Sequence, residues 1–188
     1  SDLVMNEEFK VFSDPAKKKG SRVVALKVPN GNTMSRGQID DYTKFVSKLG
    51  AKGLAYIKIN DIKDLENGIQ SPILKFLNKK TIQNIFKTLE VKTDDLIFFG
   101  AGSESVVNLS MSSLIKKLGH DLDLYVSKWA PCWIVNFPMF ELNAEGSLTP
   151  LHHPFTLPKA SKKELLENPN DVLAYAYDVV LNGYEIGG

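Results

Sequence analysis

The stretch Arg22-Val-Val-Ala-Leu-Lys-Val28 is the first of three short apolar runs that alternate with helical patterns. A run of this kind is typical of a largely buried strand, and Pro29-Asn-Gly31 closes it with a turn signal. Leu54–Ile59 and Leu96–Phe99 are the second and third runs. We therefore predict three strands that share one sheet, with helices packed against it.

Start signals for helices stand between and after these runs. Ser35-Arg-Gly-Gln38 is a capping-box pattern, in which the serine hydroxyl accepts from a backbone N–H and Gln38 reaches back. Apolar residues follow it at helical spacing. Asn78 is expected to cap a second helix, and Ser103 to begin a third that ends at Gly119.

The composition is that of an ordinary soluble globular protein, with 188 residues, 43% hydrophobic and 24% charged. No apolar run approaches the ~20 residues of a membrane span, and no secretory signal opens the sequence. The single cysteine, Cys132, excludes an intrachain disulfide and indicates a reducing compartment such as the cytoplasm. Beside Trp133 and Ile134, we expect Cys132 to be buried packing rather than a nucleophile.

The net charge of +1 does not mark the whole chain as a strong polyanion binder. Almost all the cations are lysines, several of them in runs such as Lys17-Lys18-Lys19 and Lys79-Lys80. We interpret these runs as solvated helix ends in preference to a nucleic-acid surface.

The last third of the chain has a different pattern. Trp133–Glu141 is expected to form one strand, in which Pro138 favours an edge position or a bulge. A turn at Glu145-Gly146 then leads to Leu148–His152, an antiparallel partner. Antiparallel pairing predicts a second unit distinct from the first.

Asn182-Gly183 is the strongest hairpin signal in the sequence, because both residue types tolerate positive φ. If these two residues are the loop, Val180 lies opposite Glu185. Side chains alternate along a strand, so Asp178 shares the face of Val180 and Glu185. The two carboxylates are then diagonal neighbours, roughly 7–8 Å apart at the backbone.

Spacing alone leaves two interpretations of this acid pair. The geometry suits a divalent cation such as magnesium, which takes one or two carboxylates together with phosphate oxygens and water. It equally suits two unrelated solvated acids on an exposed face.

His152-His153-Pro154 also leaves two interpretations. Adjacent residues on a strand point to opposite faces, which makes His152 and His153 a poor zinc pair. The pair is either a strand end with one packed ring, or it contributes an imidazole to a pocket for an anionic substrate.

Several long motifs, in the same order, resemble bacterial-type aspartyl-tRNA synthetases and the GAD domain inserted in them. The sequence motifs that carry the resemblance are Arg22–Pro29, Gly50–Lys58, Gly68–Ile73, Asp95–Ala101, Trp133–Glu141, Leu151–Thr156 and Ala176–Gly188.

The resemblance implies an α+β fold: a GAD insertion domain, a sheet with packed helices, followed by part of a class II synthetase antiparallel catalytic sheet. The division it implies is residues 1–21 as a catalytic-domain remnant or linker, 22–125 as the GAD domain and 126–188 as part of the catalytic domain. The chemistry it implies is activation of L-aspartate with ATP to aspartyl-adenylate and transfer to tRNA, by a homodimer of the full-length protein.

The resemblance also implies roles for single residues. His152 falls on the position that binds aspartate, and His153 is its neighbour in the same substrate loop. Glu185 falls on an ATP-binding position, and Asp178 is its partner in holding Mg²⁺ and the phosphates. This favours the metal interpretation of the acid pair.

The sequence departs from the family pattern mainly by omission. The anticodon-binding barrel, the ATP-clamping arginine and the Gly-Ser-x-Arg strand are not among these residues, so we expect an internal fragment that is inactive alone. Asn136 stands where the family more often has an acid. A GAD domain also occurs in an amidotransferase subunit that handles glutamyl-tRNA. The alternative is therefore a non-catalytic module that contacts tRNA or a protein partner.

Overall fold

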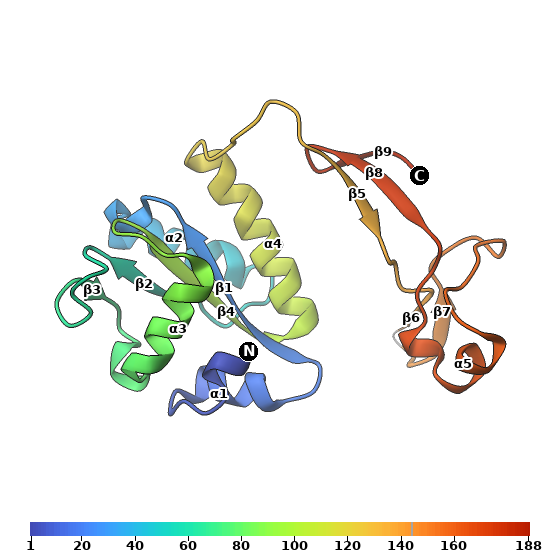
Figure 1. The fold of residues 1–188 in the computed structure, drawn as a ribbon, viewed down its shortest axis with the longest axis horizontal. Helices are drawn as coiled ribbons and strands as arrows, with labels where there is room; N and C mark the ends of the chain where they lie inside the picture. The colour runs from blue at the N-terminus through green and yellow to red at the C-terminus, as the bar shows by residue number, and fades with distance from the viewer. Residues whose placement is uncertain (144) are drawn as a thin grey trace. The chain divides into compact units, whose positions relative to one another are not determined.

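The computed structural model describes residues 1–143 and 145–188. It divides into two compact units, Ser1–Leu124 (unit 1) and Tyr125–Gly188 (unit 2). Figure 1 shows the order of their elements along the chain. In the part of the chain that the structure describes, no helix has both the length and the apolar character needed to cross a membrane.

Unit 1 is an antiparallel four-stranded sheet with helices on both faces. The strand order is β1-β4-β2-β3, and each neighbouring pair is antiparallel. Its helical elements are η1 (Asp2–Val4), α1 (Lys10–Lys17), η2 (Gly31–Thr33), α2 (Arg36–Ser47), η3 (Leu74–Phe76), α3 (Lys79–Leu89) and α4 (Glu104–Asp121). Its strands are β1 (Ser21–Val28), β2 (Ala55–Ile59), β3 (Ile69–Gln70) and β4 (Leu96–Ser103).

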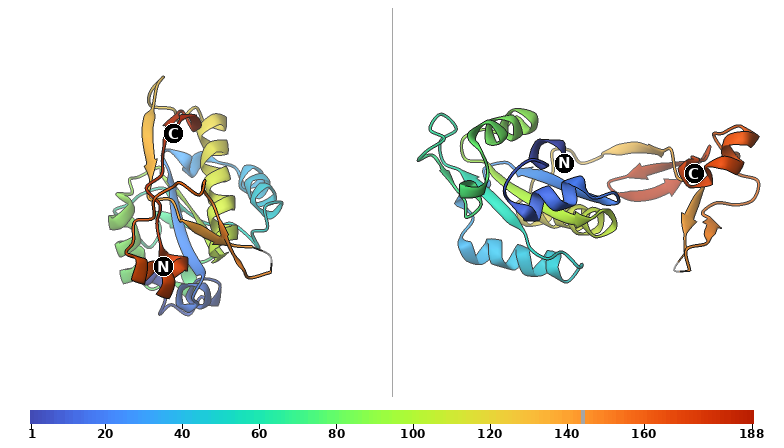
Figure 2. Two further views of the ribbon diagram at one scale, coloured as in Figure 1. Left: turned by 90° about the vertical axis from the view of Figure 1, so that its right-hand side faces the viewer. Right: turned by 90° about the horizontal axis from the view of Figure 1, so that it is seen from below.

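Strand β4 explains why the helices cover both faces. It lies between β1 and β2, and its side chains alternate between the two faces. Leu96 and Phe98 pack among residues of α2 and α4, whereas Ile97 and Phe99 pack among residues of α1 and α3. Because both faces of β4 are buried, this strand consists of a continuous apolar run. Figure 2 shows the helices on the two faces of the sheet from other sides.

The predicted helix starts of unit 1 are confirmed. Ser35 and Gln38 form both bonds of the capping box, at 3.2 and 2.8 Å. The Asn78 side chain accepts from the Thr81 amide at 2.9 Å. Helix α4 does not end at Gly119, as its glycine predicts, but continues to Asp121. Continued apolar packing of the half-buried Leu122 extends the helical turn.

The first 21 residues pack into unit 1. Phe12 is buried against Phe99, with ring centroids 5.2 Å apart, and Phe9 stacks on Phe76. The Ser1 hydroxyl accepts from the amide of Val23 at 3.0 Å. This segment therefore contributes to the core on the α1 and α3 face of the sheet.

Unit 2 contains two small antiparallel sheets, β5-β8-β9 and β6-β7. Its α-helix at Lys162–Glu167 begins with a second complete capping box, formed by Ser161 and Glu164. The α+β class expected from the sequence is confirmed. The elements are β5 (Pro131–Val135), β6 (Phe140–Leu142), β7 (Leu148–Pro150), α5 (Lys162–Glu167), η4 (Pro169–Asp171), β8 (Tyr177–Leu181) and β9 (Tyr184–Gly187).

Two expectations for unit 2 are wrong. Trp133–Glu141 is not one strand, because Asn136 adopts a left-handed φ of 61° and separates β5 from β6. Cys132 is exposed rather than buried. The reason is that all five residues of β5 are exposed, including Trp133 at 64%, so this strand has no core to face.

Candidate functional site

The hairpin at Asn182-Gly183 sets the geometry of the candidate site. Leu181 pairs with Tyr184 and Val180 with Glu185, as predicted. Asn182 and Gly183 have φ values of 51° and 85°, the conformation that this two-residue loop demands.

The hairpin orders its surroundings as well. The side-chain oxygen of Asn182 accepts from the amide of Ala130 at 2.8 Å, and its amide donates to the carbonyl of Lys128 at 3.0 Å. Sequence reasoning treated Asn182 only as a turn residue. The segment entering β5 is in fact held by this side chain.

Asp178 and Glu185 lie on the same sheet. Asp178 pairs with Ile134 across β5 and β8, and Val180 opposes Glu185 across β8 and β9. A bulge places Ile186 as an extra residue of β9, but β8 continues without an insertion. Because alternation along β8 is intact, the two carboxylates share a face.

The acid pair has the chemistry of an incomplete cation site. Asp178 is half-buried beside Gly188, and Glu185 is exposed. Within residues 1–143 and 145–188, neither carboxylate takes part in a side-chain hydrogen bond or an ion pair. Nor does any group of three or more His, Cys, Asp or Glu residues there form a metal site. A cation held by this pair would therefore need ligand oxygens from phosphate or water.

The two histidines lie in the loop after β7, beyond the strand itself. His152 is half-buried, its ring meets Phe137 edge-on, and its Nε2 is 3.0 Å from the carbonyl of Pro138. A carbonyl only accepts, so Nε2 carries the hydrogen and Nδ1 is left for a ligand.

His153 has different neighbours. It is exposed, and its Nδ1 accepts from the amide of Phe155 at 3.3 Å. The two rings therefore present separate ring nitrogens: Nδ1 of His152 and Nε2 of His153. Among the described residues no hydrogen bond or ion pair joins either histidine to the two acids, which belong to the other sheet.

The comparison with known families concerns unit 1. A model of the GAD domain matches residues 12–111, just over half of the chain. The chain belongs to the GAD domain family. This domain is the insertion domain of bacterial-type aspartyl-tRNA synthetases and also occurs in GatB-type proteins.

The GAD domain match defines what the family assignment covers. It begins in α1, takes in the whole sheet of unit 1 and ends in α4. Asp178, Glu185 and the histidine pair all lie outside it, in unit 2. Their roles therefore rest on the motifs and the local geometry of unit 2 rather than on the GAD domain.

Proposed function

We propose that these residues belong to an aspartyl-tRNA synthetase, with the GAD domain followed by part of the catalytic domain at 126–188. The enzyme activates L-aspartate with ATP and transfers the aspartyl group to tRNA, as a cytoplasmic homodimer. Family membership supports the context, because the GAD domain occurs in these synthetases. The antiparallel sheet of unit 2 agrees with the catalytic sheet that such an enzyme needs.

The observation that carries the proposal is the register of the β8–β9 hairpin. It puts Asp178 and Glu185 on one face, and both carboxylates are without protein partners among the described residues. Two carboxylates supply only part of the ligands that Mg²⁺ requires. They therefore suit a Mg²⁺ ion that is also bound by the phosphates of a nucleotide. In this proposal Glu185 and Asp178 hold ATP through its magnesium, which when bound neutralises phosphate charge.

The histidine loop supplies the amino-acid side of the proposed site. The Nε2–H of the exposed His153 ring is a donor for an anionic substrate, and Nδ1 of His152 becomes a donor when that ring is protonated. We therefore assign L-aspartate binding to His152 and His153. The Phe137 ring and the Pro138 carbonyl fix the orientation of His152.

The exposed apolar side chains of the β5-β8-β9 sheet also support a larger catalytic domain. Trp133, Tyr177 and Ile186 are all more than half exposed. Large apolar side chains of this kind are usually buried in a folded domain. Apolar surface of this extent is normally covered by other structure. We propose that the remainder of the synthetase covers it.

Exchange of labelled pyrophosphate into ATP in the presence of aspartate tests this function, using the natural full-length gene product. We expect exchange with aspartate, and a loss on the order of 100-fold for Glu185→Gln and for Asp178→Asn. The matched control is Glu141→Gln, an exposed acid on β6. The 188 residues alone should show no exchange. Absence of aspartate-dependent exchange by the full-length protein, or an equal loss in the control, contradicts the proposal.

One observation favours a second candidate. Unit 1 has two core clusters of its own, one on each face of its sheet, so the GAD domain does not need unit 2 to bury its apolar residues. Such a unit suits a binding module that contacts tRNA or a protein partner without chemistry. Exchange activity of the full-length protein that depends on Glu185 decides for the synthetase.

A further inference from the structure

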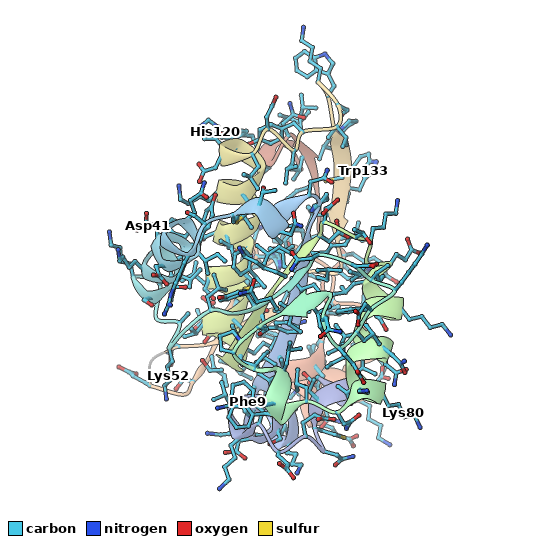
Figure 3. All side chains as sticks on the ribbon, turned by 90° about the vertical axis from the view of Figure 1, so that its left-hand side faces the viewer. Phe9, Asp41, Lys52, Lys80, His120 and Trp133 are labelled. Atoms are coloured by element: carbon cyan, nitrogen blue, oxygen red, sulfur yellow. The ribbon has the colours of Figure 1, made fainter. Side chains whose placement is uncertain are left out.

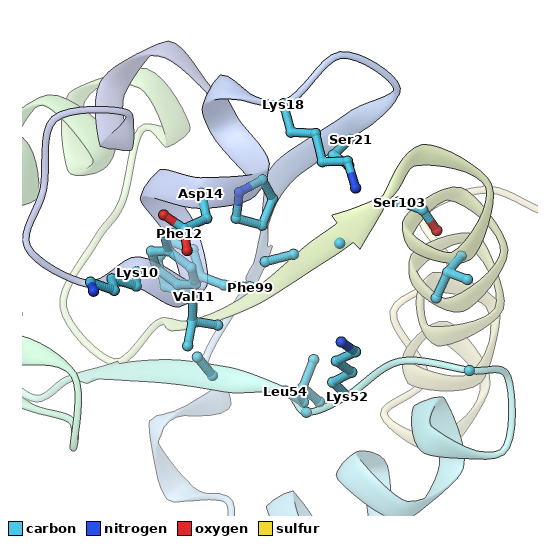
Figure 4. A pocket seen from close by; sticks show the side chains of 17 residues that line it. Lys10, Val11, Phe12, Asp14, Lys18, Ser21, Lys52, Leu54, Phe99 and Ser103 are labelled. Carbon is cyan, nitrogen blue, oxygen red and sulfur yellow. The ribbon is translucent and has the colours of Figure 1, made fainter.

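Unit 1 contains a cleft of about 850 Å³ that has no role in the proposed synthetase site. It opens between α1, the loop before β2, the end of β4 and the start of α4 (Figure 4). This volume lies in the range of small-molecule sites, roughly 300–1,000 Å³. All the residues that line the cleft belong to unit 1, so none of the acids and histidines proposed for the site in unit 2 takes part in it.

Two lysines approach the same space from opposite sides of this cleft. Lys18 follows α1 and Lys52 precedes β2, and their ammonium groups point toward each other across the cleft in Figure 4. Ser21 and Ser103 also line the cleft, and Figure 4 shows both on the side of Lys18. Neither lysine forms an ion pair within the described residues, since the four ion pairs found there involve other cations.

The other end of the cleft is closer to neutral. Lys10 and Asp14 are one helical turn apart on α1, where opposite charges offset each other. Among the described residues, the lining contains one acid, Asp14, against three lysines. Positive charge therefore concentrates between Lys18 and Lys52.

The wall beside this charge is apolar. Val11 lies on it with 56% of its surface exposed, and the half-buried Pro15 and Val106 also line the cleft. A simple inorganic anion would leave this wall in contact with water. A ligand with an anionic group and a flat apolar body would cover both parts.

We propose that this cleft binds a nucleotide unit, with its phosphate between Lys18 and Lys52 and its base against the apolar wall at Val11. Serine hydroxyls at the phosphate end donate further hydrogen bonds, and lysine suits phosphate as a point charge. The unit is either a free nucleotide or one residue of a single-stranded RNA. The inference stands on the cleft and does not rest on the synthetase activity.

The test is a titration of the ¹⁵N-labelled 188-residue chain, followed by amide chemical shifts, with EDTA present to exclude metal-dependent binding in unit 2. The probes are AMP, a 5′-phosphorylated tetrauridylate and inorganic phosphate. We expect shifts in 50–55 and 100–104, and at least tenfold weaker binding of phosphate than of AMP or RNA. Lys18→Ala/Lys52→Ala should weaken binding at least tenfold.

The control is Lys80→Ala/Lys87→Ala, two exposed lysines on α3; Figure 3 shows Lys80 at the surface of unit 1. Binding of both AMP and RNA at the cleft identifies a nucleotide site, and binding of RNA alone identifies a strand-binding site. The proposal is overturned if neither probe shifts the cleft amides, if phosphate binds as tightly as AMP, or if the control loses as much affinity. An unchanged amide spectrum outside the cleft verifies that the double variant is folded.

Discussion

The hydroxyl of Tyr42 donates a hydrogen bond of 3.0 Å to the carboxylate of Asp121, which joins α2 to the last turn of α4. Lys117, one turn earlier on α4, lies 2.9 Å from the same carboxylate. Burial, and then the hydrogen bond and charge of Asp121, raise the pKa of Tyr42 to about 12. The hydrogen bond from Lys117 is the main cause that lowers the pKa of Asp121. The cluster therefore favours a neutral tyrosine beside an ionised aspartate.

This cluster predicts a loss of stability at alkaline pH. The folded-state pKa of Tyr42 lies above its ordinary value of 10.0, so its contribution is complete below pH 10 and is lost as the pH rises toward 12. We expect the urea midpoint of unit 1 to fall more steeply across this window in wild type than in Tyr42→Phe, followed by circular dichroism. Parallel curves for the two proteins would show that Tyr42 does not cause the loss.

A buried carboxylate near the N-terminus predicts a second effect. Glu7 accepts hydrogen bonds from the Asn78 amide at 2.9 Å and from the Thr81 hydroxyl, at the start of α3. Glu7→Ala leaves these donors without a partner. A hydrogen bond to a charged group contributes about 1.5–3 kcal/mol to the free energy of unfolding. We expect unfolding in urea to require about 2–3 kcal/mol less free energy. Glu8→Ala, at the exposed neighbour, should change it by under about 0.5 kcal/mol.

Close packing of the backbone predicts a third effect, at Gly68. A Cβ there would press on the carbonyl oxygen of Asp61 and lie 2.5 Å from that of Asp64. The amide of Gly68 also donates to the backbone carbonyl of Asp64 at 2.8 Å, so the loop has little freedom to move aside. We expect Gly68→Ala to destabilise unit 1 by about 1–3 kcal/mol or more in the same assay.

Gly53→Ala is the control for this substitution, because no atom outside Gly53 and its two chain neighbours lies within 4 Å of the added methyl group. It should be neutral or slightly stabilising, since alanine reduces the freedom of the unfolded chain. If both variants unfold alike, the loop around Gly68 relaxes without cost.

Local signals predicted much of this fold because each depends on few residues. Ser35 with Gln38, Asn78 and Asn182-Gly183 form the expected caps and loop, since a cap or a two-residue turn is decided within four residues. The apolar run of β4 predicted a buried strand for the same reason. The hairpin register predicted that Asp178 and Glu185 share a face, whereas their role in a site was implied only by the family resemblance.

The features that were missed depend on contacts distant in the sequence. Helix α1 has Pro15 inside it and is held by Phe12 packing on Phe99, which no local pattern indicates. The break at Asn136 depends on a left-handed backbone conformation and on Lys159, which donates to its side chain at 2.7 Å. The cleft joins Lys18 and Lys52 from segments 34 residues apart, so the run Lys17-Lys18-Lys19 indicates only a solvated helix end, and no local pattern marks Lys52.

The unequal burial of the two units predicts unequal protection from hydrogen exchange. Among the described residues of unit 2, the core has three buried members, Met139, Val172 and Ala174, and none belongs to the β5-β8-β9 sheet. A three-stranded sheet needs one buried apolar face for stability, and this one exposes Trp133 and Ile186.

We therefore expect peptides from β8 and β9 of the 188-residue chain to exchange at least about 100-fold faster than peptides from β4, measured by mass spectrometry. Strand β4 serves as the internal reference, because both of its faces are covered within unit 1. Equal protection of the two sheets would mean that another surface covers the β5-β8-β9 sheet in this chain. The exposed apolar side chains of this sheet would then not require the remainder of a synthetase catalytic domain to cover them.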